Sequence, residues 1–207
     1  MLKLFYAPGS CALASHIALR EASAEFKLRP VDFVAAEQRG AEYKKVNPKG
    51  RVPALETERG VITETPAILA YIAQTHPEAK LAPLDDPFES ARLQSFNSYL
   101  CATVHVAHAH SRRGERWADD ESAIAEMKRK APEVVAGCFQ LIEDEFFAGP
   151  WAMGAAYSVA DPYLFTITRW LRFHKIDSAG YPKVHDHMQR MLERPAVQAA
   201  LEAEASG

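Results

Sequence analysis

Cys11 is the residue with the clearest capacity for chemistry. It follows a Pro8-Gly9-Ser10 turn and opens an expected helix, so its thiol would face unpaired backbone N–H groups and the positive end of the helix dipole. Both favour the thiolate, which predicts a pKa below that of a free thiol. Ala14 stands where a dithiol motif has its second cysteine, so a redox cycle would need a thiol from a small molecule. The alternative is a small, buried apolar residue.

A second candidate is the pair Val52-Pro53, which follows Gly50 and enters an expected strand. Proline is tolerated at the first residue of a strand, and a cis bond there would suit a tight turn. A cis bond would turn the Val52 backbone outward. Its N–H and C=O would then be free to pair with an extended peptide.

Glu64-Thr65 lies where an expected strand ends and a helix begins. Thr65 could cap that helix, whose N-terminus favours a carboxylate, while Glu64 could meet an amino group. Together the two residues could hold the α-amino acid end of a ligand. The alternative is an ordinary helix cap beside a surface glutamate.

Cys101, His105 and His108 fall at i, i+4 and i+7, on one face of an expected helix. Thiolate and imidazole are zinc ligands, but three ligands on one helix need a fourth group, and we expect no metal site. His108 could line a pocket for a second substrate or face solvent, and Arg112 is assigned to the same pocket. Trp117 is assigned to it because an exposed Trp in a polar loop marks a pocket or an interface.

The first 80 residues predict alternating strands and helices in the order β-α-β-α-β-β-α. The expected strands are 2–6, 26–31, 54–57 and 61–63, and the expected helices are 10–21, 37–45 and 65–74. A mixed sheet with helices on its faces is the natural arrangement for this order.

Three prolines in segment 76–87 predict a linker, and after it only helices are expected. The expected helices are 89–110, 121–147, 159–175 and 182–193. The fold class is therefore α/β plus all-α, with domains at 1–78 and 88–207.

Composition excludes several classes of protein. The 207 residues hold 24 Lys plus Arg against 27 Asp plus Glu, so the basic footprint of a nucleic-acid-binding protein is absent. Arg112, Arg113 and Arg116 are diluted by Glu115 and are interpreted as a solvated helix end. No apolar run of membrane-spanning length occurs, and the apolar stretch in the first residues is too short for a signal peptide. Three cysteines without an export signal indicate free thiols in a reducing cytoplasm.

The chain resembles the cytosolic glutathione S-transferases, most closely the bacterial beta class. Four segments carry the resemblance: KLFYAPGSC at 3–11, NPKGRVPAL at 47–55, ETPAI at 64–68 and SVAD at 158–161. They follow in the family's order and span essentially the whole chain. The first two together are highly specific, whereas the last alone would be a common capping box.

The resemblance implies a thioredoxin-like N-terminal domain, a helical C-terminal domain, a homodimer and glutathione as an extended co-substrate. Val52 would pair with the cysteinyl backbone of glutathione beside a cis Pro53. Glu64 and Thr65 would take the γ-glutamyl end, and Cys11 would lie beside the sulfur, able to form a mixed disulfide.

The resemblance also assigns roles on the first long helix. His105 matches a family histidine that points at the site. Ser98 aligns with a family asparagine, and a one-residue shift would put Asn97 there instead. Some relatives use a tyrosine or serine hydroxyl in catalysis, so Tyr6 and Ser10 are secondary catalytic candidates.

One departure concerns the glycine carboxylate of glutathione. The beta class often has a lysine near it, but here that position is Ala36. Arg39 or Arg51 could substitute for the lysine.

The expected activity is glutathione-dependent transfer to small electrophilic or disulfide substrates, in detoxification. In one mechanism glutathione attacks the electrophile and Cys11 only stabilises its thiolate. In the other, Cys11 is the nucleophile and forms a mixed disulfide that a second glutathione resolves. A glutathione-dependent dehalogenase, isomerase or ether-cleaving enzyme is a specialised alternative. A non-catalytic docking module of the same fold is another.

Overall fold

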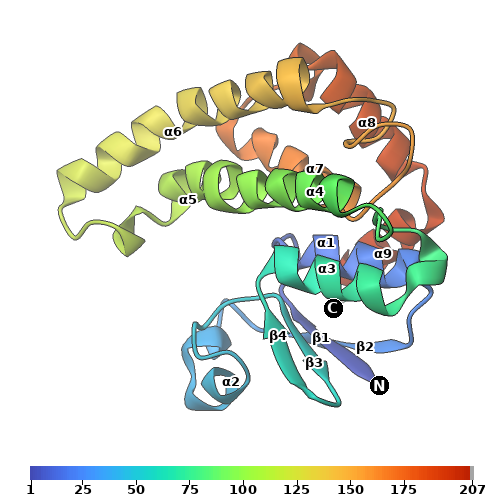
Figure 1. The fold of residues 1–207 in the computed structure, drawn as a ribbon. Helices are drawn as coiled ribbons and strands as arrows, with labels where there is room; N and C mark the ends of the chain where they lie inside the picture. The colour runs from blue at the N-terminus through green and yellow to red at the C-terminus, as the bar shows by residue number, and fades with distance from the viewer. Residues whose placement is uncertain (206–207) are drawn as a thin grey trace.

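A four-stranded mixed sheet forms the base of the molecule in the computed structural model, which describes residues 1–205 (Figure 1). The strands are β1 (Leu2–Tyr6), β2 (Phe26–Pro30), β3 (Ala54–Thr57) and β4 (Gly60–Thr63), in the spatial order β2-β1-β3-β4. β1 runs parallel to β2 and antiparallel to β3, and β4 closes a hairpin with β3. This is the mixed sheet predicted from the order of elements.

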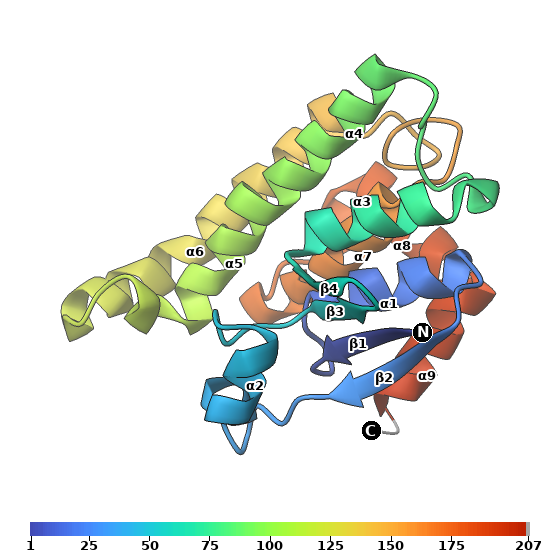
Figure 2. The same cartoon turned by 60° about the horizontal axis from the view of Figure 1, so that its bottom comes forward.

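Helices α1 (Ala12–Glu21) and α3 (Thr65–Thr75) lie on the face of the sheet that meets the rest of the chain, and α2 (Ala41–Val46) lies beside the sheet (Figures 1 and 2). The helix expected at 37–45 is broken. A 3-10 turn at Glu37–Arg39 ends at Gly40, whose extended backbone (φ −69°, ψ 154°) separates it from α2.

The second part of the described chain is helical. Its helices are α4 (Pro87–Tyr99), α5 (His105–Arg112), α6 (Glu121–Leu141), α7 (Ala160–Thr168), α8 (Pro182–Leu192) and α9 (Pro195–Ala205). A π-helical turn at Leu100–Val104 joins α4 to α5, and a 3-10 turn at Arg169–His174 extends α7. The four predicted helices are therefore found, but α9 was not predicted. Residues 206–207 of the expected second domain lie outside the described residues.

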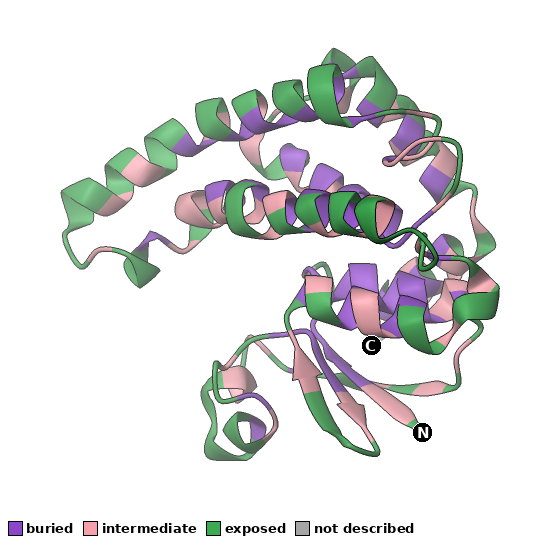
Figure 3. Cartoon of the chain, viewed as in Figure 1, coloured by how far each residue is buried: buried purple, intermediate pink, exposed green. Residues whose placement is uncertain are grey.

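α7 forms the centre of the core, because every residue from 160 to 168 is buried (Figure 3). Its start is held by Asp161, whose carboxylate accepts hydrogen bonds from the N–H groups of Ser158 (2.7 Å) and Ala152 (2.8 Å). The ring Nε2 of His187 lies 3.0 Å from the same carboxylate. The SVAD segment thus supplies one half of a capping box, the bond from Asp161 back to the Ser158 N–H, while Ser158 Oγ accepts from the N–H of Ala160.

α9 returns the chain to the first domain and packs on α1 (Figure 2). Arg194, just before α9, holds Glu21 at the end of α1 through two hydrogen bonds of 2.5 and 2.7 Å. Bidentate pairs of this kind fix orientation as well as adding stability. Within residues 1–205, the helices lack the length and apolar content needed to cross a bilayer.

Candidate functional site

Cys11 lies where the loop after β1 enters α1. Gly9 has φ +70°, a backbone conformation that suits glycine, and it lets the loop turn back toward the sheet. Cys11 occupies the N-cap position of α1, and Ala12 is the first helical residue. The Cys11 thiol donates a hydrogen bond to the Val52 carbonyl oxygen, with Sγ and O 3.5 Å apart. Two segments 41 residues apart in the sequence therefore meet at this thiol.

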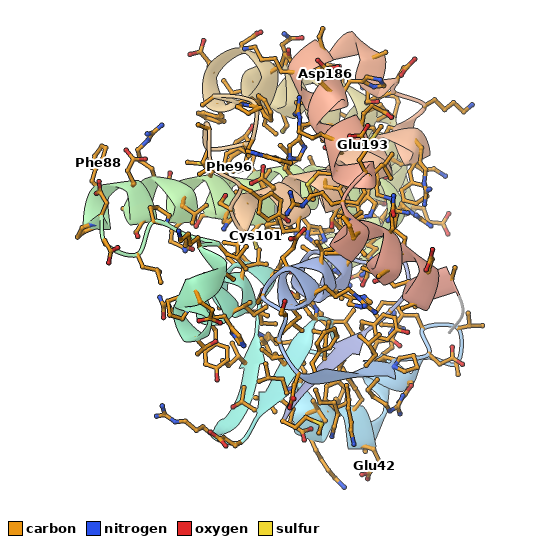
Figure 4. The ribbon with its side chains drawn as sticks, turned by 90° about the vertical axis from the view of Figure 1, so that its right-hand side faces the viewer. Glu42, Phe88, Phe96, Cys101, Asp186 and Glu193 are labelled. Carbon is orange, nitrogen blue, oxygen red and sulfur yellow. The ribbon has the colours of Figure 1, made fainter. Side chains whose placement is uncertain are left out.

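The predicted lowering of the Cys11 pKa is wrong for this structure. Burial is the largest influence and raises the pKa of the thiol to about 11, with the nearby Cys101 adding to the rise. A hydrogen bond with the Thr65 side chain and the charge of Arg113 act in the opposite direction and are outweighed. Only 9% of Cys11 is exposed, so the loss of hydration destabilises the thiolate more than these hydrogen bonds and charges stabilise it. Cys101 comes from the helical domain, on the side that faces the first domain (Figure 4).

The Val52-Pro53 peptide bond is cis, as the family resemblance implied. The residue before it, Arg51, has its carbonyl oxygen held by the Tyr43 hydroxyl (2.8 Å) and by the Asn47 side-chain amide (2.6 Å). These two bonds fix the turn that leads into β3. The Arg51 side chain itself is exposed.

Glu64 and Thr65 stand at the start of α3, as expected, but Thr65 does not cap it. The N-cap position belongs to Glu64, and no side chain makes a cap hydrogen bond there. Thr65 is instead the first helical residue, is only 4% exposed, and directs its hydroxyl to Cys11. Glu64 has φ +74° and ψ 125°, a sparsely populated conformation for a residue with a side chain, and its carboxylate pairs with Lys49. Such conformations concentrate at functional sites.

The two secondary hydroxyl candidates lie in different places. Ser10 Oγ accepts a hydrogen bond from the N–H of Ala12 (3.3 Å), beside Cys11. Tyr6 is buried at the end of β1, with its ring 6.2 Å from that of His16, and burial and the charge of Glu204 raise its pKa. The structure thus places Tyr6 on the α9 side of the loop.

Two residues of the helical domain hold the loop before Cys11, and the sequence pointed to neither. Glu204 on α9 accepts a hydrogen bond from the N–H of Gly9 (2.9 Å), and Trp170 donates its indole N–H to the Gly9 carbonyl oxygen (3.0 Å). Both polar groups of this one peptide segment are therefore fixed from the second domain.

His105 packs against the edge of Trp170, with ring centroids 4.9 Å apart. Burial lowers its pKa to about 4, helped by the charges of Arg113, Arg116 and Arg51, while Glu64 acts in the opposite direction. Its imidazole is therefore neutral near pH 7. Because the charges of Arg51 and Glu64 act on its pKa, His105 lies near the two segments of the first domain that also surround Cys11.

His108 does not line an open pocket. It is 5% exposed, its Nδ1 lies 2.8 Å from Nε2 of His174, and the rings of Phe139 and Trp170 pack on it. Burial lowers its pKa to about 3. Within residues 1–205, no three His, Cys, Asp or Glu side chains come together as a metal site would require.

The other two residues predicted to line the second-substrate pocket, Arg112 and Trp117, contact different aromatic rings. Arg112 lies over the ring of Phe173, 4.4 Å from its centroid, rather than beside His105. Trp117 is 46% exposed, and its ring packs on that of His110 at 4.5 Å.

Asn97 is fully buried, and neither of its side-chain amide atoms has a hydrogen-bond partner among the described residues. Its neighbour Ser98 is exposed on α4. Asn97 and Ser98, the two alternatives for the family asparagine, thus differ in surroundings: Asn97 lies inside the molecule and Ser98 on its surface.

Two cavities lie away from Cys11. The larger, of about 530 Å³, is lined by residues from the end of α1, the start of β2 and α9, so it lies at the opposite end of α1 from Cys11. The smaller, of about 170 Å³, lies between α3 and α4. Neither includes a residue of the group around Cys11.

Comparison with known proteins gives a consistent result. Residues 1–74 match the glutathione S-transferase N-terminal domain, and residues 101–195 match the C-terminal domain. The chain is 36% identical to glutathione S-transferase GstA of Escherichia coli O157:H7, over 98% of both chains.

Solved structures agree. A glutathione transferase homologue from Sulfitobacter with bound glutathione is 42% identical, with a TM-score of 0.95 and 98% coverage of both chains. A beta-class glutathione S-transferase of Sphingomonas chungbukensis is 38% identical, with a TM-score of 0.85 and the same coverage. With the thioredoxin-like sheet, the helical second part and the site around Cys11, these matches show that the chain belongs to the glutathione S-transferase family, enzymes that use glutathione as co-substrate.

Proposed function

We propose that the reaction occurs at the domain junction where Cys11, Val52 and Thr65 meet, with glutathione lying there in extended form. The observation that carries the proposal is the convergence of three separate segments on one thiol, through the Val52 carbonyl oxygen and the Thr65 side chain. Val52 would pair with the cysteinyl backbone of glutathione beside Pro53. Glu64, in its strained conformation at the start of α3, and Thr65 would take the γ-glutamyl end.

We propose direct attack by glutathione as the leading mechanism. The glutathione sulfur forms the new bond to the electrophile, the leaving group departs with its electron pair, and the thiol proton goes to solvent. A Cys11 thiol that keeps its proton up to a pKa of about 11 suits a hydrogen-bond donor to the glutathione thiolate better than a nucleophile. Ser10 lies beside it, and the neutral imidazole of His105 can act as a polar partner at the same junction.

A Cys11→Ala variant tests this mechanism. We expect conjugation of 1-chloro-2,4-dinitrobenzene to fall less than tenfold, because glutathione still attacks, and exchange with a glutathione mixed disulfide to be lost, because in that slower reaction Cys11 is the attacking thiol. Loss of both activities in a folded variant would make Cys11 the nucleophile for both. Cys138→Ala provides the matched control, because that buried cysteine lies on α6, away from the site.

We propose that an arginine replaces the family lysine at the glycine carboxylate of glutathione. Ala36 has φ +55° and ends the loop that leads to Arg39. The exposed Arg51 side chain follows the Tyr43-anchored turn directly before Val52. Arg51 is the stronger candidate, since its backbone is fixed next to the proposed peptide-binding residue. Arg51→Gln should raise the KM for glutathione.

We also propose that the protein is a beta-class homodimer. The beta-class assignment is supported by the neighbour of that class and by a cysteine at the start of α1. The dimer is supported by the groove between α3 and α4 and by Phe88, 71% exposed at the start of α4. Light scattering should give twice 23.0 kDa for the chain and a smaller mass for Phe88→Asp. A mass of 23.0 kDa for the unchanged chain would overturn the dimer.

The domain limits of 1–78 and 88–207 and a cytoplasmic location remain proposals. The two family matches, at 1–74 and 101–195, lie within the proposed domains. All three cysteines are free thiols, which suits a reducing compartment.

A further inference from the structure

Four arginines, two from each domain, lie close enough together for the charges of three of them to act on the fourth, Arg116. Arg39 ends the turn before α2, and Arg51 directly precedes Val52, in the first domain. Arg113 follows α5, and Arg116 ends the 3-10 turn after it, in the helical domain. The guanidinium of Arg113 lies 5.9 Å from the ring centroid of Phe33, which joins the two domains there. In Figure 1 the end of α5 and the turn after it lie on the same side of the molecule as α2.

The charges of these arginines act on one another. Burial and the charges of Arg113, Arg51 and Arg39 lower the pKa of Arg116, and Glu115 is the one acid that acts against them. Within residues 1–205, none of the four guanidinium groups forms an ion pair or donates a hydrogen bond to the chain. Among the other arginines of residues 1–205, Arg29, Arg92, Arg129 and Arg194 pair with carboxylates and six do not.

The charges of these arginines also act on the pKa values of His105 and Cys11. Arg113, Arg116 and Arg51 all act on His105, and Arg113 acts on the Cys11 thiol. A cleft lined by one sign of charge raises the local concentration of ligands of the opposite sign. The whole chain carries a net charge of −3, so this positive region is a local feature.

Glutathione alone does not use all four arginines. Its γ-glutamyl end is assigned to Glu64 and Thr65, and its glycine carboxylate needs one arginine, for which Arg51 and Arg39 are placed. Arg113 and Arg116 remain, on the helical domain, where the charges of both act on His105. Guanidinium groups match carboxylates in geometry, and such charge-assisted hydrogen bonds are among the strong ones.

We infer that the electrophilic co-substrate of this enzyme carries a carboxylate, which Arg113 and Arg116 bind while the electrophilic carbon faces the glutathione sulfur. This inference rests on the proposed function, since it concerns the second ligand of the same site. It distinguishes the enzyme from a transferase that selects neutral apolar electrophiles.

Two electrophiles of matched shape test the inference: 4-chloro-3,5-dinitrobenzoate and its neutral carboxamide. For each, kcat/KM is divided by the uncatalysed rate with glutathione, and the carboxylate-to-carboxamide ratio is compared between enzymes. We expect a ratio of about 10 for the unchanged enzyme and about 1 for Arg113→Gln/Arg116→Gln, a change of ~1.4 kcal/mol carried by the KM of the carboxylate. Arg129→Gln, a surface arginine on α6, should keep the ratio of the unchanged enzyme.

An equal loss with both electrophiles would overturn the inference, because the arginines would then serve only to stabilise the glutathione thiolate. A ratio near 1 in the unchanged enzyme would overturn it as well.

Binding separates failure of the inference from failure of the proposed function. Calorimetric titration of 4-chloro-3,5-dinitrobenzoate into enzyme saturated with S-methylglutathione needs no turnover. If neither electrophile is conjugated, the proposed mechanism fails. The inference then stands if the carboxylate binds about tenfold tighter than the carboxamide and the double variant removes the difference. It falls if the two bind equally.

Discussion

Cys11 should react slowly with alkylating reagents, because burial raises the pKa of its thiol and keeps it protonated near neutral pH. With a pKa of about 11, the thiolate fraction at pH 7.5 is about 3 in 10,000. A thiol at the ordinary value of 9.0 would have about 3 in 100 as thiolate at the same pH. Because the thiolate is the nucleophile, Cys11 should react with iodoacetamide about 100-fold more slowly than the same cysteine in the unfolded chain.

The assay is peptide mass spectrometry of Cys11 alkylation between pH 6 and 11, for the folded chain without glutathione and for the chain in urea. The folded profile should rise with a midpoint well above that in urea. Thr65→Val should move the midpoint further up, since it removes a hydrogen bond that lowers the pKa. A folded midpoint below 9 would refute the reasoning, since the helix end would then dominate over burial.

Three further predictions concern the groups that hold the site in place. Glu204→Ala should lower the Tm by about 5 °C and raise the KM for glutathione, because the N–H of Gly9 loses a charged acceptor worth about 2 kcal/mol. Glu193→Ala, which replaces an exposed residue before α9, should change neither the Tm nor the KM. Asp161→Ala should cost about 3 kcal/mol or more in urea unfolding, because buried N–H groups lose their acceptor; a loss under 1 kcal/mol would contradict this role. The free energy of unfolding should fall as the pH drops from about 6.5 toward 3. His108 is protonated in the unfolded chain over this range, but in the folded chain its pKa is about 3 and it stays neutral. His108→Gln should flatten this pH dependence in denaturant titrations.

The order of elements was predictable because each carries a local signal. Arg59-Gly60 marked the turn of the β3–β4 hairpin, and apolar periodicity marked α7 as the central helix. The error at Gly40 is also local: one glycine in an extended conformation was enough to split a short helix pattern.

The chemistry of the site was less predictable, because it depends on contacts between distant segments. The position of Cys11 at a helix start was right, but its pKa follows from burial under the Val52 turn and the helical domain, which no nearby residue signals. The hold of Glu204 on Gly9 spans 195 residues, and the helix that carries it was not predicted. Arg113 and Arg116 were interpreted from the sequence as a solvated helix end, but in the fold the charge of Arg51, 65 residues earlier, lowers the pKa of Arg116.

A crystal structure of the protein with glutathione tests the central claim most directly. We predict glutathione in extended form, with its sulfur beside Cys11, its cysteinyl backbone paired with Val52 and its γ-glutamyl end at Glu64 and Thr65. Glutathione bound elsewhere, for example in the 530 Å³ cavity between α1 and α9, and not beside Cys11, would contradict the account.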